Sequence, residues 1–322
     1  MKAVLVSKAG GPEVLEVVER EMPTVKEGWS VVKVMGFGIN HSEIFTRQGL
    51  SPSVTFPRVL GIEMVGVIEE SSDPNQLPIG QKVVSIMGEM GRAYDGSYAE
   101  YALLPNDNLY IIETDLDWQD LASVPETYYT AYGSMKNLKI EADDCILVRA
   151  GASGVGQAFA KLVRARFPQV KLVASVRHLD KKEKLLEAGF HQVILDREGK
   201  LETKQTFTKI LELVGPATIK DSLDYLEEDG IICSTGQLGG QWYLEEFDPI
   251  EMLQKNVYLT TFYSGNVNQE RLQDMFDYIR AYQVPVGPEK VFFIDDIQAA
   301  HSYLESKESF GKVIVLNHQE DF

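Results

Sequence analysis

Three glycines lie in the middle of the chain, between an apolar run and a segment with helical spacing. Residues 146–148 have the length and branching of a buried parallel strand, and Gly151, Gly154 and Gly156 follow them. Apolar residues then recur at helical spacing, at Val155, Phe159, Leu162 and Val163. Such glycines let the backbone approach a diphosphate, whose charge is stabilised by the N–H groups and dipole at the helix start. The pattern predicts a phosphate-binding turn; a tight strand-to-helix turn that binds nothing is the alternative.

The residues around this turn alternate between strand and helix patterns. Further strands are expected at 170–175, 192–195, 209–214, 230–234 and 257–262, and helices at about 180–188 and 219–226. Strands and helices in this order are typical of an α/β fold with a doubly wound parallel sheet. Together with the glycine turn, they predict a dinucleotide-binding domain.

The end of the second strand of this domain carries a base where many dinucleotide sites carry an acid. Sites that prefer NAD usually place Asp or Glu there, where the carboxylate accepts hydrogen bonds from the ribose hydroxyls. Here Arg177 follows Ser175 by two residues, and the first acid, Asp180, comes later. The Arg177 guanidinium and the nearby Lys181 suit the additional 2′-phosphate of NADPH. We therefore predict NADPH over NADH, the alternative being that these bases form an ordinary solvated surface.

Composition limits the partners and the compartment. The net charge of −17 argues against nucleic acid or an anionic membrane surface as a partner. The two cysteines, Cys145 and Cys233, both lie in predicted strands, which favours a reducing compartment. No apolar run reaches the ~18 residues that would span a membrane. We expect a cytoplasmic protein that acts on a small molecule.

The two ends of the chain differ in pattern from its middle. Residues 1–122 contain short strand-like runs separated by Gly, Pro and Asn clusters, which indicates an antiparallel, barrel-like β domain. The last part of the chain is mixed, with helices expected at about 270–282 and 297–304 and strands at 291–294 and 311–316. We predict that residues 123–264 are inserted between the two parts of the β domain, 1–122 and 265–322. The nicotinamide end of the cofactor is then expected in a cleft between the domains.

Short segments along nearly the whole chain carry a family resemblance. They include Gly38-Ile-Asn-His41, Leu60-Gly-Ile-Glu63, Gly96-Ser-Tyr-Ala-Glu-Tyr101, Ser234-Thr-Gly236 and Gly311-Lys-Val-Ile-Val315. In this order and spacing, with the glycine turn among them, they resemble the medium-chain dehydrogenase/reductase superfamily and its zinc-free quinone oxidoreductase branch. The resemblance implies a GroES-like catalytic domain, a Rossmann domain and NADPH as hydride donor. It also implies a homodimer joined through the edge of the Rossmann sheet.

The resemblance also identifies the positions at which zinc-dependent members bind their catalytic metal. Where those members have Cys and His ligands, this chain has Asn40 and Ile62, and Cys145 belongs to the first strand of the dinucleotide-binding domain. A catalytic zinc needs three nitrogen, sulfur or carboxylate ligands, so we predict no metal. Without a Lewis acid to lower the pKa of an alcohol, efficient alcohol oxidation is not expected. A zinc-dependent alcohol dehydrogenase is the alternative that metal analysis would test.

The predicted reaction is NADPH-dependent transfer of hydride to a quinone or an α,β-unsaturated carbonyl compound. Negative charge then develops on the carbonyl oxygen, and we predict that the Asn40 amide donates a hydrogen bond to it. A turn-stabilising role for Asn40 is the alternative. Tyr128 is a candidate proton donor and is equally explained by packing at a domain junction. The predicted cofactor-binding residues are Asn40, Thr127, Ser153, Gly154, Val155, Gly156, Ser175, Arg177, Lys181 and Gly236.

Two questions stay open at this point. Asp196 places an acid close to the expected adenosine phosphate region, which leaves open how NADPH is bound there. The chain also fits a catalytically weak NADPH-binding sensor or scaffold protein, because a fold does not fix a function. The residues do not distinguish a quinone from an activated alkene, since both need the same hydride geometry.

Overall fold

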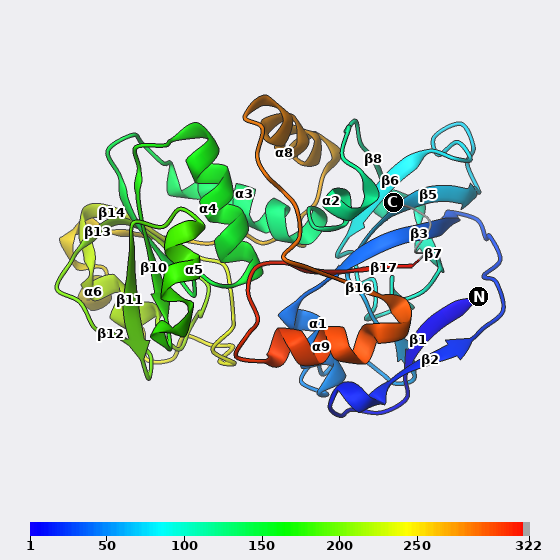
Figure 1. Cartoon of the computed structure of the whole chain (residues 1–322), viewed down its shortest axis with the longest axis horizontal. Helices are drawn as coiled ribbons and strands as arrows, with labels where there is room; N and C mark the ends of the chain where they lie inside the picture. Colours follow the sequence, from blue (N-terminus) through cyan, green and yellow to red (C-terminus); the bar gives the residue numbers. More distant parts are fainter. Residues whose placement is uncertain (318–322) are drawn as a thin grey trace. The chain divides into compact units, whose positions relative to one another are not determined.

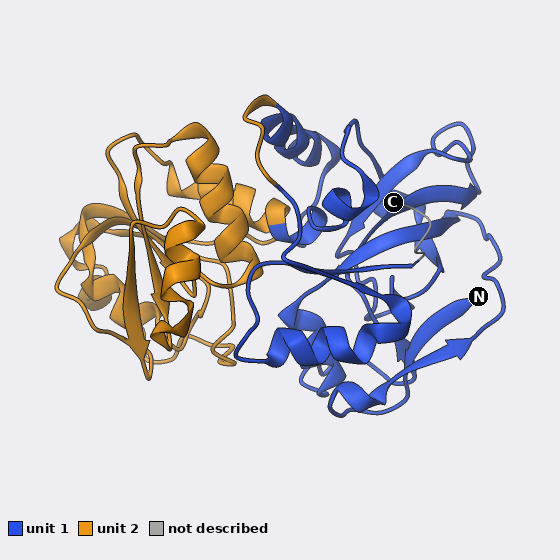
Figure 2. Ribbon diagram, viewed as in Figure 1, with its two compact units in different colours: residues 1–127, 265–280, 286–322 blue, residues 128–264, 281–285 orange. Residues whose placement is uncertain are grey.

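The computed structural model of the chain describes residues 1–317, which fall into two compact units (Figures 1 and 2). Unit 1 contains residues 1–127, 265–280 and the chain from residue 286 onward, and unit 2 contains residues 128–264 and 281–285. The predicted boundaries after residues 122 and 264 lie close to these bounds. Residues 281–285, predicted for the first domain, belong to unit 2.

Unit 2 is built on a seven-stranded sheet (Figure 1). In spatial order its strands are β12 (Lys200–Leu201), β11 (Gln192–Arg197), β10 (Lys171–Val176), β9 (Cys145–Arg149), β13 (Phe207–Glu212), β14 (Leu226–Ser234) and β15 (Tyr258–Thr260). All neighbours are parallel except β11 and β12. The strand order reverses between β9 and β13, where doubly wound sheets bind their ligands. The predicted doubly wound parallel sheet is confirmed.

The helices of unit 2 follow its strands. They are the long helix α3 (Pro125–Leu138), which enters from unit 1, and α4 (Gly154–Arg166), α5 (Lys182–Glu187), α6 (Ile219–Asp224) and α7 (Pro249–Met252). Figure 1 shows α4 and α5 side by side over one face of the sheet. The middle of β9, Ile146 to Val148, is fully buried, as its continuous apolar run requires.

Unit 1 contains two sheets. The larger one has the order β16 (Lys290–Phe293), β17 (Val313–Leu316), β3 (Trp29–Ile39), β5 (Glu63–Glu70), β6 (Lys82–Ile86) and β8 (Tyr110–Ile111), and β7 (Tyr101–Pro105) also pairs with β3. The smaller one has the order β2 (Leu15–Glu19), β1 (Lys2–Val6) and β4 (Arg58–Val59). The helices are α1 (His41–Arg47), α2 (Trp118–Ala122), α8 (Gln269–Ala281) and α9 (Ile297–Glu305). The late strands β16 and β17 thus complete a sheet begun near the N-terminus, which agrees with the predicted split β domain.

Several short elements differ from the sequence expectation. The helix expected at 180–188 is a 3₁₀ turn, Leu179–Lys181, continued by α5, and the two-residue strand β12 was not expected. A two-residue strand is too short to show a period, so its sequence carries no signal. The helix expected to reach residue 226 ends at Asp224, and β14 begins already at Leu226.

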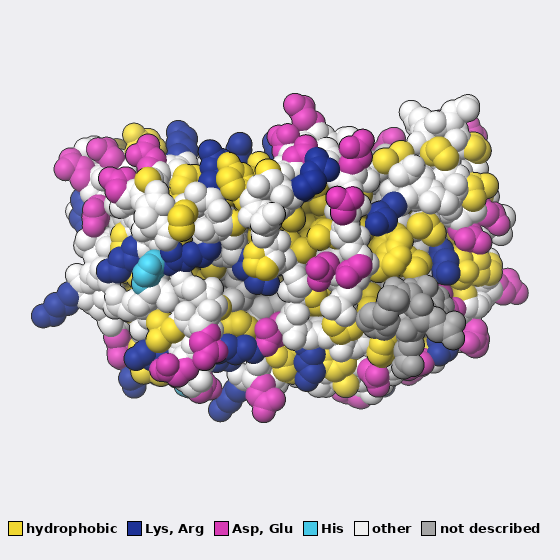
Figure 3. Space-filling view, turned by 45° about the horizontal axis from the view of Figure 1, so that its top comes forward, with side chains coloured by type: hydrophobic (Ala, Val, Ile, Leu, Met, Phe, Trp, Pro, Cys, Tyr) yellow, Lys and Arg dark blue, Asp and Glu magenta, His cyan; other side chains and the backbone are white. Residues whose placement is uncertain are grey.

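The surface carries its charge in mixed form. On the face drawn in Figure 3, acidic and basic side chains are interspersed with apolar ones, so the net charge of −17 is not gathered into one field there. Within residues 1–317, every helix is too short or too polar to cross a membrane.

Candidate functional site

The glycine turn of unit 2 connects β9 to the N-terminus of α4. Ser153 is the N-cap of α4, and its hydroxyl accepts a hydrogen bond from the Gly156 N–H at 3.2 Å. The other N–H groups of a first helical turn, here those of Gly154 and Val155, have no acceptor within the helix. A Cβ on Gly156 would lie 2.8 Å from the Gly151 carbonyl oxygen, so only glycine permits this tight turn. The turn therefore has the form that binds a diphosphate.

Ser175, near the end of β10, fastens this turn to the sheet. Its hydroxyl accepts the Ala150 N–H at 3.2 Å, and its carbonyl accepts the Gly151 N–H at 3.2 Å. Ala150 has a φ of +65°, in the left-handed region that is unfavourable for a residue with a Cβ. Ser175 is buried, and it fixes the backbone next to the predicted phosphate site.

The bases predicted to bind a 2′-phosphate lie just beyond β10. Arg177 is exposed, and Lys181 is half-buried at the end of the 3₁₀ turn. Burial lowers the pKa of the Lys181 ammonium, and the neighbouring Arg177 charge lowers it further. A nearby anion would raise the pKa of Lys181 again, because it favours the charged form of the lysine.

Two further loops meet at the same edge of the sheet, after β13 and β14. The Glu212 carboxylate accepts the N–H groups of Val214 and Gly215 at 2.9 and 3.1 Å, and the Glu212 carbonyl accepts the Gly236 N–H at 3.2 Å. A Cβ on Gly236 would overlap the carbonyl oxygen of Leu213. Together with the turn after β9, these close backbone approaches fit a nicotinamide dinucleotide.

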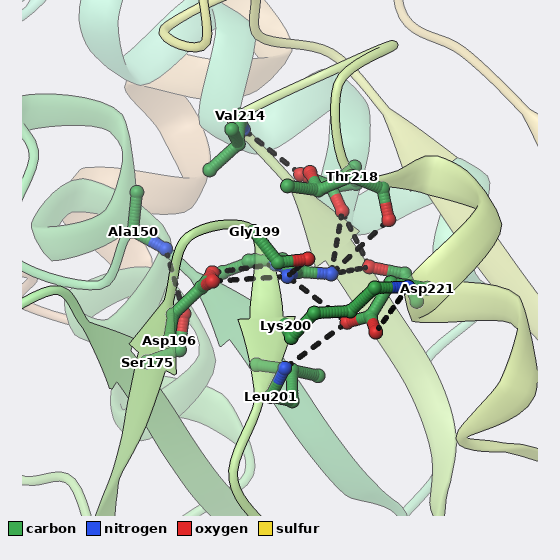
Figure 4. A network of polar contacts seen from close by, with 12 residues as sticks. Ala150, Ser175, Asp196, Gly199, Lys200, Leu201, Val214, Thr218 and Asp221 are labelled. Atoms are coloured by element: carbon green, nitrogen blue, oxygen red, sulfur yellow. Dashed lines mark hydrogen bonds and ion pairs between the residues drawn. The ribbon is translucent and has the colours of Figure 1, made fainter.

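The acid that sequence reasoning placed near the adenosine phosphate points inward. The Asp196 carboxylate accepts two hydrogen bonds from the Arg149 guanidinium, with N–O distances of 2.7 and 3.1 Å, and so forms a bidentate ion pair with it. Figure 4 shows the position of Asp196 in this network. The Arg149 side chain is fully buried, and that of Asp196 is 8% exposed. The charge of Asp196 is therefore paired within unit 2.

A second polar group lies in unit 1, where three neighbouring strands of the larger sheet begin or end. Asn40 follows β3, Glu63 opens β5, and Lys312 precedes β17. Because β17, β3 and β5 are adjacent and antiparallel, these three residues lie at one edge of the sheet. We call Asn40, Glu43, Glu63 and Lys312 the Lys312 cluster.

Lys312 is the hub of this cluster. Its ammonium donates to the Asn40 Oδ1 atom at 2.8 Å and to the Glu63 Oε1 atom at 2.5 Å. The Asn40 Nδ2 atom donates to Glu63 Oε1 at 2.8 Å and lies 3.5 Å from Glu43 Oε1. A Cβ on Gly38 would overlap both Glu63 and Lys312, which explains the glycine two residues before Asn40.

Glu43 is the unusual acid of the cluster. Burial, and then the charge of Glu63, raise the pKa of the Glu43 carboxyl to about 7, although the Lys312 charge opposes the change. One lysine cannot neutralise two buried carboxylates, so the second acid retains its proton more strongly. The Ser42 hydroxyl, 3.0 Å from Glu43 Oε2, and the Ile62 N–H, 3.3 Å from Oε1, are its further partners.

Asn40 differs from a turn-stabilising asparagine. It occupies the N-cap position of α1, yet its side chain makes no capping hydrogen bond to that helix. The amide instead bonds to Lys312 and Glu63, which fixes its oxygen toward the ammonium and its nitrogen toward the carboxylates. The remaining contact of its nitrogen, with Glu43 Oε1, is longer, at 3.5 Å.

Thr127 and Tyr128 lie near the start of α3, and both are buried, each 2% exposed. The Tyr128 hydroxyl donates to the Pro285 carbonyl at 3.4 Å. This contact agrees with a packing role, and a role for Tyr128 as proton donor stays a prediction.

The two positions at which zinc-dependent relatives have metal ligands are occupied here by an amide and a buried aliphatic side chain. Asn40 is bonded to Lys312, and Ile62 is 4% exposed. Within residues 1–317, no three His, Cys, Asp or Glu side chains come together as a metal-binding group. An ammonium group thus supplies the fixed positive charge beside Asn40.

Sequence reasoning missed Lys312, Glu43 and Arg149 as parts of these sites. Lys312 is more than 240 residues from its partners in the cluster, with sequence separations of 272 and 249. The segment Gly311 to Val315 contributed to the family resemblance, but no sequence spacing indicated that Lys312 would contact Asn40. For Arg149 the available signal was its place directly after the apolar run of β9. A basic residue at the end of a buried strand indicates a buried acidic partner, since charged side chains are rarely buried unless they are paired.

Comparisons with known proteins agree with this architecture. Residues 26–114 match the family described as Alcohol dehydrogenase GroES-like domain, and residues 188–315 match the family described as Zinc-binding dehydrogenase. Quinone oxidoreductase 1 of Escherichia coli (strain K12) is 26% identical over 328 residues, covering 96% of this chain and 97% of that protein. Quinone oxidoreductase of Sus scrofa is 23% identical over 334 residues, covering 98% of each chain.

A solved structure shows the same fold over the full length. The Escherichia coli quinone oxidoreductase complexed with NADPH has a TM-score of 0.83 to this chain at 24% identity, covering 98% of this chain and 100% of that one. The two matched domains and the relatives matched over nearly their full length indicate an oxidoreductase, and they make this chain similar to the zinc-free quinone oxidoreductases of the medium-chain dehydrogenase/reductase superfamily.

Proposed function

We propose that the protein reduces a quinone or an α,β-unsaturated carbonyl compound with NADPH, without a metal. The observation that carries this proposal is the Lys312 cluster. It presents an oriented amide, that of Asn40, beside the fixed ammonium group of Lys312. An acceptor that is already electron-poor needs a hydrogen-bond donor for its developing negative charge, and it does not need a Lewis acid.

Three residues of the cluster, Lys312, Asn40 and Glu63, have distinct tasks in this proposal. Lys312 holds the oxygen of Asn40 and Glu63 accepts one of its N–H groups, so that the other N–H, with its long contact to Glu43, is the one proposed for donation. The proposed donation is to the carbonyl oxygen of the acceptor, where negative charge appears. Glu63 fixes Lys312 and accepts the Glu126 N–H at 2.8 Å, which ties the cluster to the start of α3. When bound, the cofactor supplies the hydride.

Unit 2 is proposed to bind NADPH. The turn of Ser153 to Gly156 would hold the diphosphate, and Arg177 and Lys181 would hold the 2′-phosphate; Ser175 and Gly236 shape the surrounding backbone. The Escherichia coli relative whose structure contains NADPH supports this choice of cofactor. The two thiols, Cys145 and Cys233, are not joined in a disulfide, which supports the proposed cytoplasmic location.

Replacing Arg177 should separate the two cofactors. Arg177→Ala is expected to weaken NADPH binding by about 10- to 100-fold, the worth of one charge-assisted hydrogen bond. NADH lacks the 2′-phosphate, so its affinity should change by less than about threefold. Fluorescence titration of each reduced cofactor measures both constants, and Lys204→Ala, an exposed lysine of the same unit, is the matched control. Equal losses for NADPH and NADH would show that Arg177 does not bind the 2′-phosphate.

A test of turnover separates the enzyme from a sensor or scaffold. The enzyme should consume NADPH when a quinone or an enone is added, whereas a sensor would bind NADPH tightly and show no consumption with any acceptor. Loss of activity after metal chelation would contradict the metal-free mechanism.

We also propose that the protein is a homodimer joined through β15. This strand is the last of its sheet, so one of its edges is unpaired as far as residues 1–317 are concerned. Tyr258 on β15 is 59% exposed and Tyr263 beyond it 69%, although large aromatic side chains are usually covered.

Light scattering after gel filtration should give twice the 36.1 kDa mass of the chain. Tyr258→Glu should shift the mass toward the monomer and the control Ile79→Glu, at an exposed apolar residue of unit 1, should not. A monomeric wild-type protein would overturn the proposal.

A further inference from the structure

Arg149 lies at the centre of a buried polar network in unit 2, and Figure 4 labels four of its partners, Asp196, Gly199, Thr218 and Asp221. Besides the ion pair with Asp196, its guanidinium lies 3.0 Å from Asp221 and donates to the Ser222 hydroxyl at 2.8 Å. It also donates to the carbonyls of Thr218 and Gly199, at 3.1 and 2.9 Å. The N–H donors of the arginine are thus distributed over five residues, Asp196, Asp221, Ser222, Thr218 and Gly199, which a lysine could not match.

The charges of this network are unequal. The acids Asp196, Glu212 and Asp221 are all nearly buried and surround a single buried cation, with Glu212 at 3.9 Å. An exposed lysine, Lys200, approaches Asp221 at 3.3 Å and supplies part of the missing charge. Within residues 1–317, Arg149 is the cation that pairs with Asp196, so the neutralisation of the Asp196 charge depends on that residue.

The position of Asp196 gives this pairing a consequence for the cofactor. Val176, the last residue of β10, is paired with Leu195 of β11, so Arg177, which follows β10, and Asp196, near the end of β11, lie at the same edge of the sheet. Arg177 is the proposed partner of the 2′-phosphate. An ionised Asp196 carboxylate facing that edge would repel the phosphate and compete for Arg177.

We propose that Arg149 is a positioning residue that sets cofactor selectivity, by drawing the Asp196 carboxylate inward and neutralising it. With its charge paired to Arg149, Asp196 no longer repels a 2′-phosphate bound beside β11. This inference rests on the proposed NADPH function. It assigns the preference for NADPH to a buried residue that contacts no phosphate, in addition to the exposed Arg177.

The test compares the affinities for NADPH and NADH in a mutant cycle, by fluorescence titration of the reduced cofactors. Arg149→Met should reduce the NADPH-to-NADH affinity ratio about tenfold or more, the effect of an uncompensated neighbouring charge. Asp196→Asn alone should leave the ratio within about twofold, and the double variant Arg149→Met with Asp196→Asn should restore it. A merely structural role for Arg149 would weaken both cofactors equally, and an unchanged ratio in Arg149→Met would overturn the inference.

Arg149→Met leaves acids buried without a cation, so a milder variant is included. Arg149→Lys keeps the charge but cannot reach both Asp196 oxygens and Asp221, and its ratio should fall about threefold and recover on adding Asp196→Asn. An unchanged ratio in a folded Arg149→Lys protein would also overturn the inference. If the wild-type protein prefers NADH, the proposed cofactor is wrong; if it prefers NADPH and both Arg149 variants keep that preference, only the role of Arg149 is wrong.

Discussion

Lys312→Met is expected to destabilise the protein by about 3–5 kcal/mol, the usual effect of removing one partner from a buried ion pair. Glu63 is fully buried and Lys312 is 6% exposed, so water cannot replace the lost ammonium group. Glu43 lies in the same cluster, and two carboxylates would then share a site without a cation. Urea unfolding followed by circular dichroism measures the change as a lower midpoint.

The matched control for this variant is Lys8→Met, at an exposed lysine of the same unit. Its midpoint should equal that of the wild type, because isolated surface charges contribute little. Adding Glu63→Gln to Lys312→Met should recover part of the loss, since it removes the buried negative charge that was left unpaired. Equal midpoints for Lys312→Met and Lys8→Met would show that the Lys312 cluster does not stabilise the fold.

Glu43→Gln is expected to stabilise the protein at alkaline pH and to change little at acidic pH. The pKa of Glu43 is raised from 4.5 to about 7, so the folded protein binds this proton more tightly than the unfolded chain does. The resulting stability is fully present below pH 4.5 and is lost as the pH rises through about 7. The loss is on the order of 3 kcal/mol. Glutamine resembles the protonated acid at every pH, so the Glu43→Gln protein does not lose this stability as the pH rises.

The measurement is the difference in unfolding free energy between Glu43→Gln and wild type, from pH 4.5 to pH 8. The groups that share the site with Glu43 are Glu63, Lys312 and Tyr98, and they are present in both proteins, so the difference isolates Glu43. Glu27→Gln, at an exposed glutamate, is the control and should show no such trend. A difference that stays constant with pH would contradict the assignment of a raised pKa to Glu43.

The parts of the fold with a strong local signal were predictable from sequence. The apolar run of β9, the glycine turn and the helical spacing of α4 are contiguous, and each predicts one kind of local structure: a buried strand, a tight turn and a helix. The later strands and helices of unit 2 alternate at the spacing of a parallel sheet, and β17 was recognisable as an apolar run. Gly151 and Gly156 locate the proposed phosphate site for the same reason, because a Cβ at either position would come too close to neighbouring atoms.

The rest of the candidate site depends on long-range pairing, which no local pattern records. Lys312 meets Asn40 only because β17 pairs with β3, and Arg149 meets Asp196 only across the end of β10. Asp196 illustrates the difference most clearly. In sequence it is an acid near a phosphate site, and in the structure its charge belongs to a buried arginine. The identity of a buried charge partner could not be predicted, because it is set by the fold.

The most direct test of the proposed function is the rate at which the wild-type protein, freed of metal by a chelator, oxidises NADPH in the presence of an acceptor. The acceptors are ortho- and para-quinones and α,β-unsaturated aldehydes and ketones, with NADH in parallel, and the signal is the near-ultraviolet absorbance of the reduced cofactor. We expect turnover with at least one of these acceptors, faster with NADPH than with NADH and unaffected by the chelator. Tight NADPH binding without consumption of any acceptor would contradict the proposed reductase and favour a sensor or scaffold.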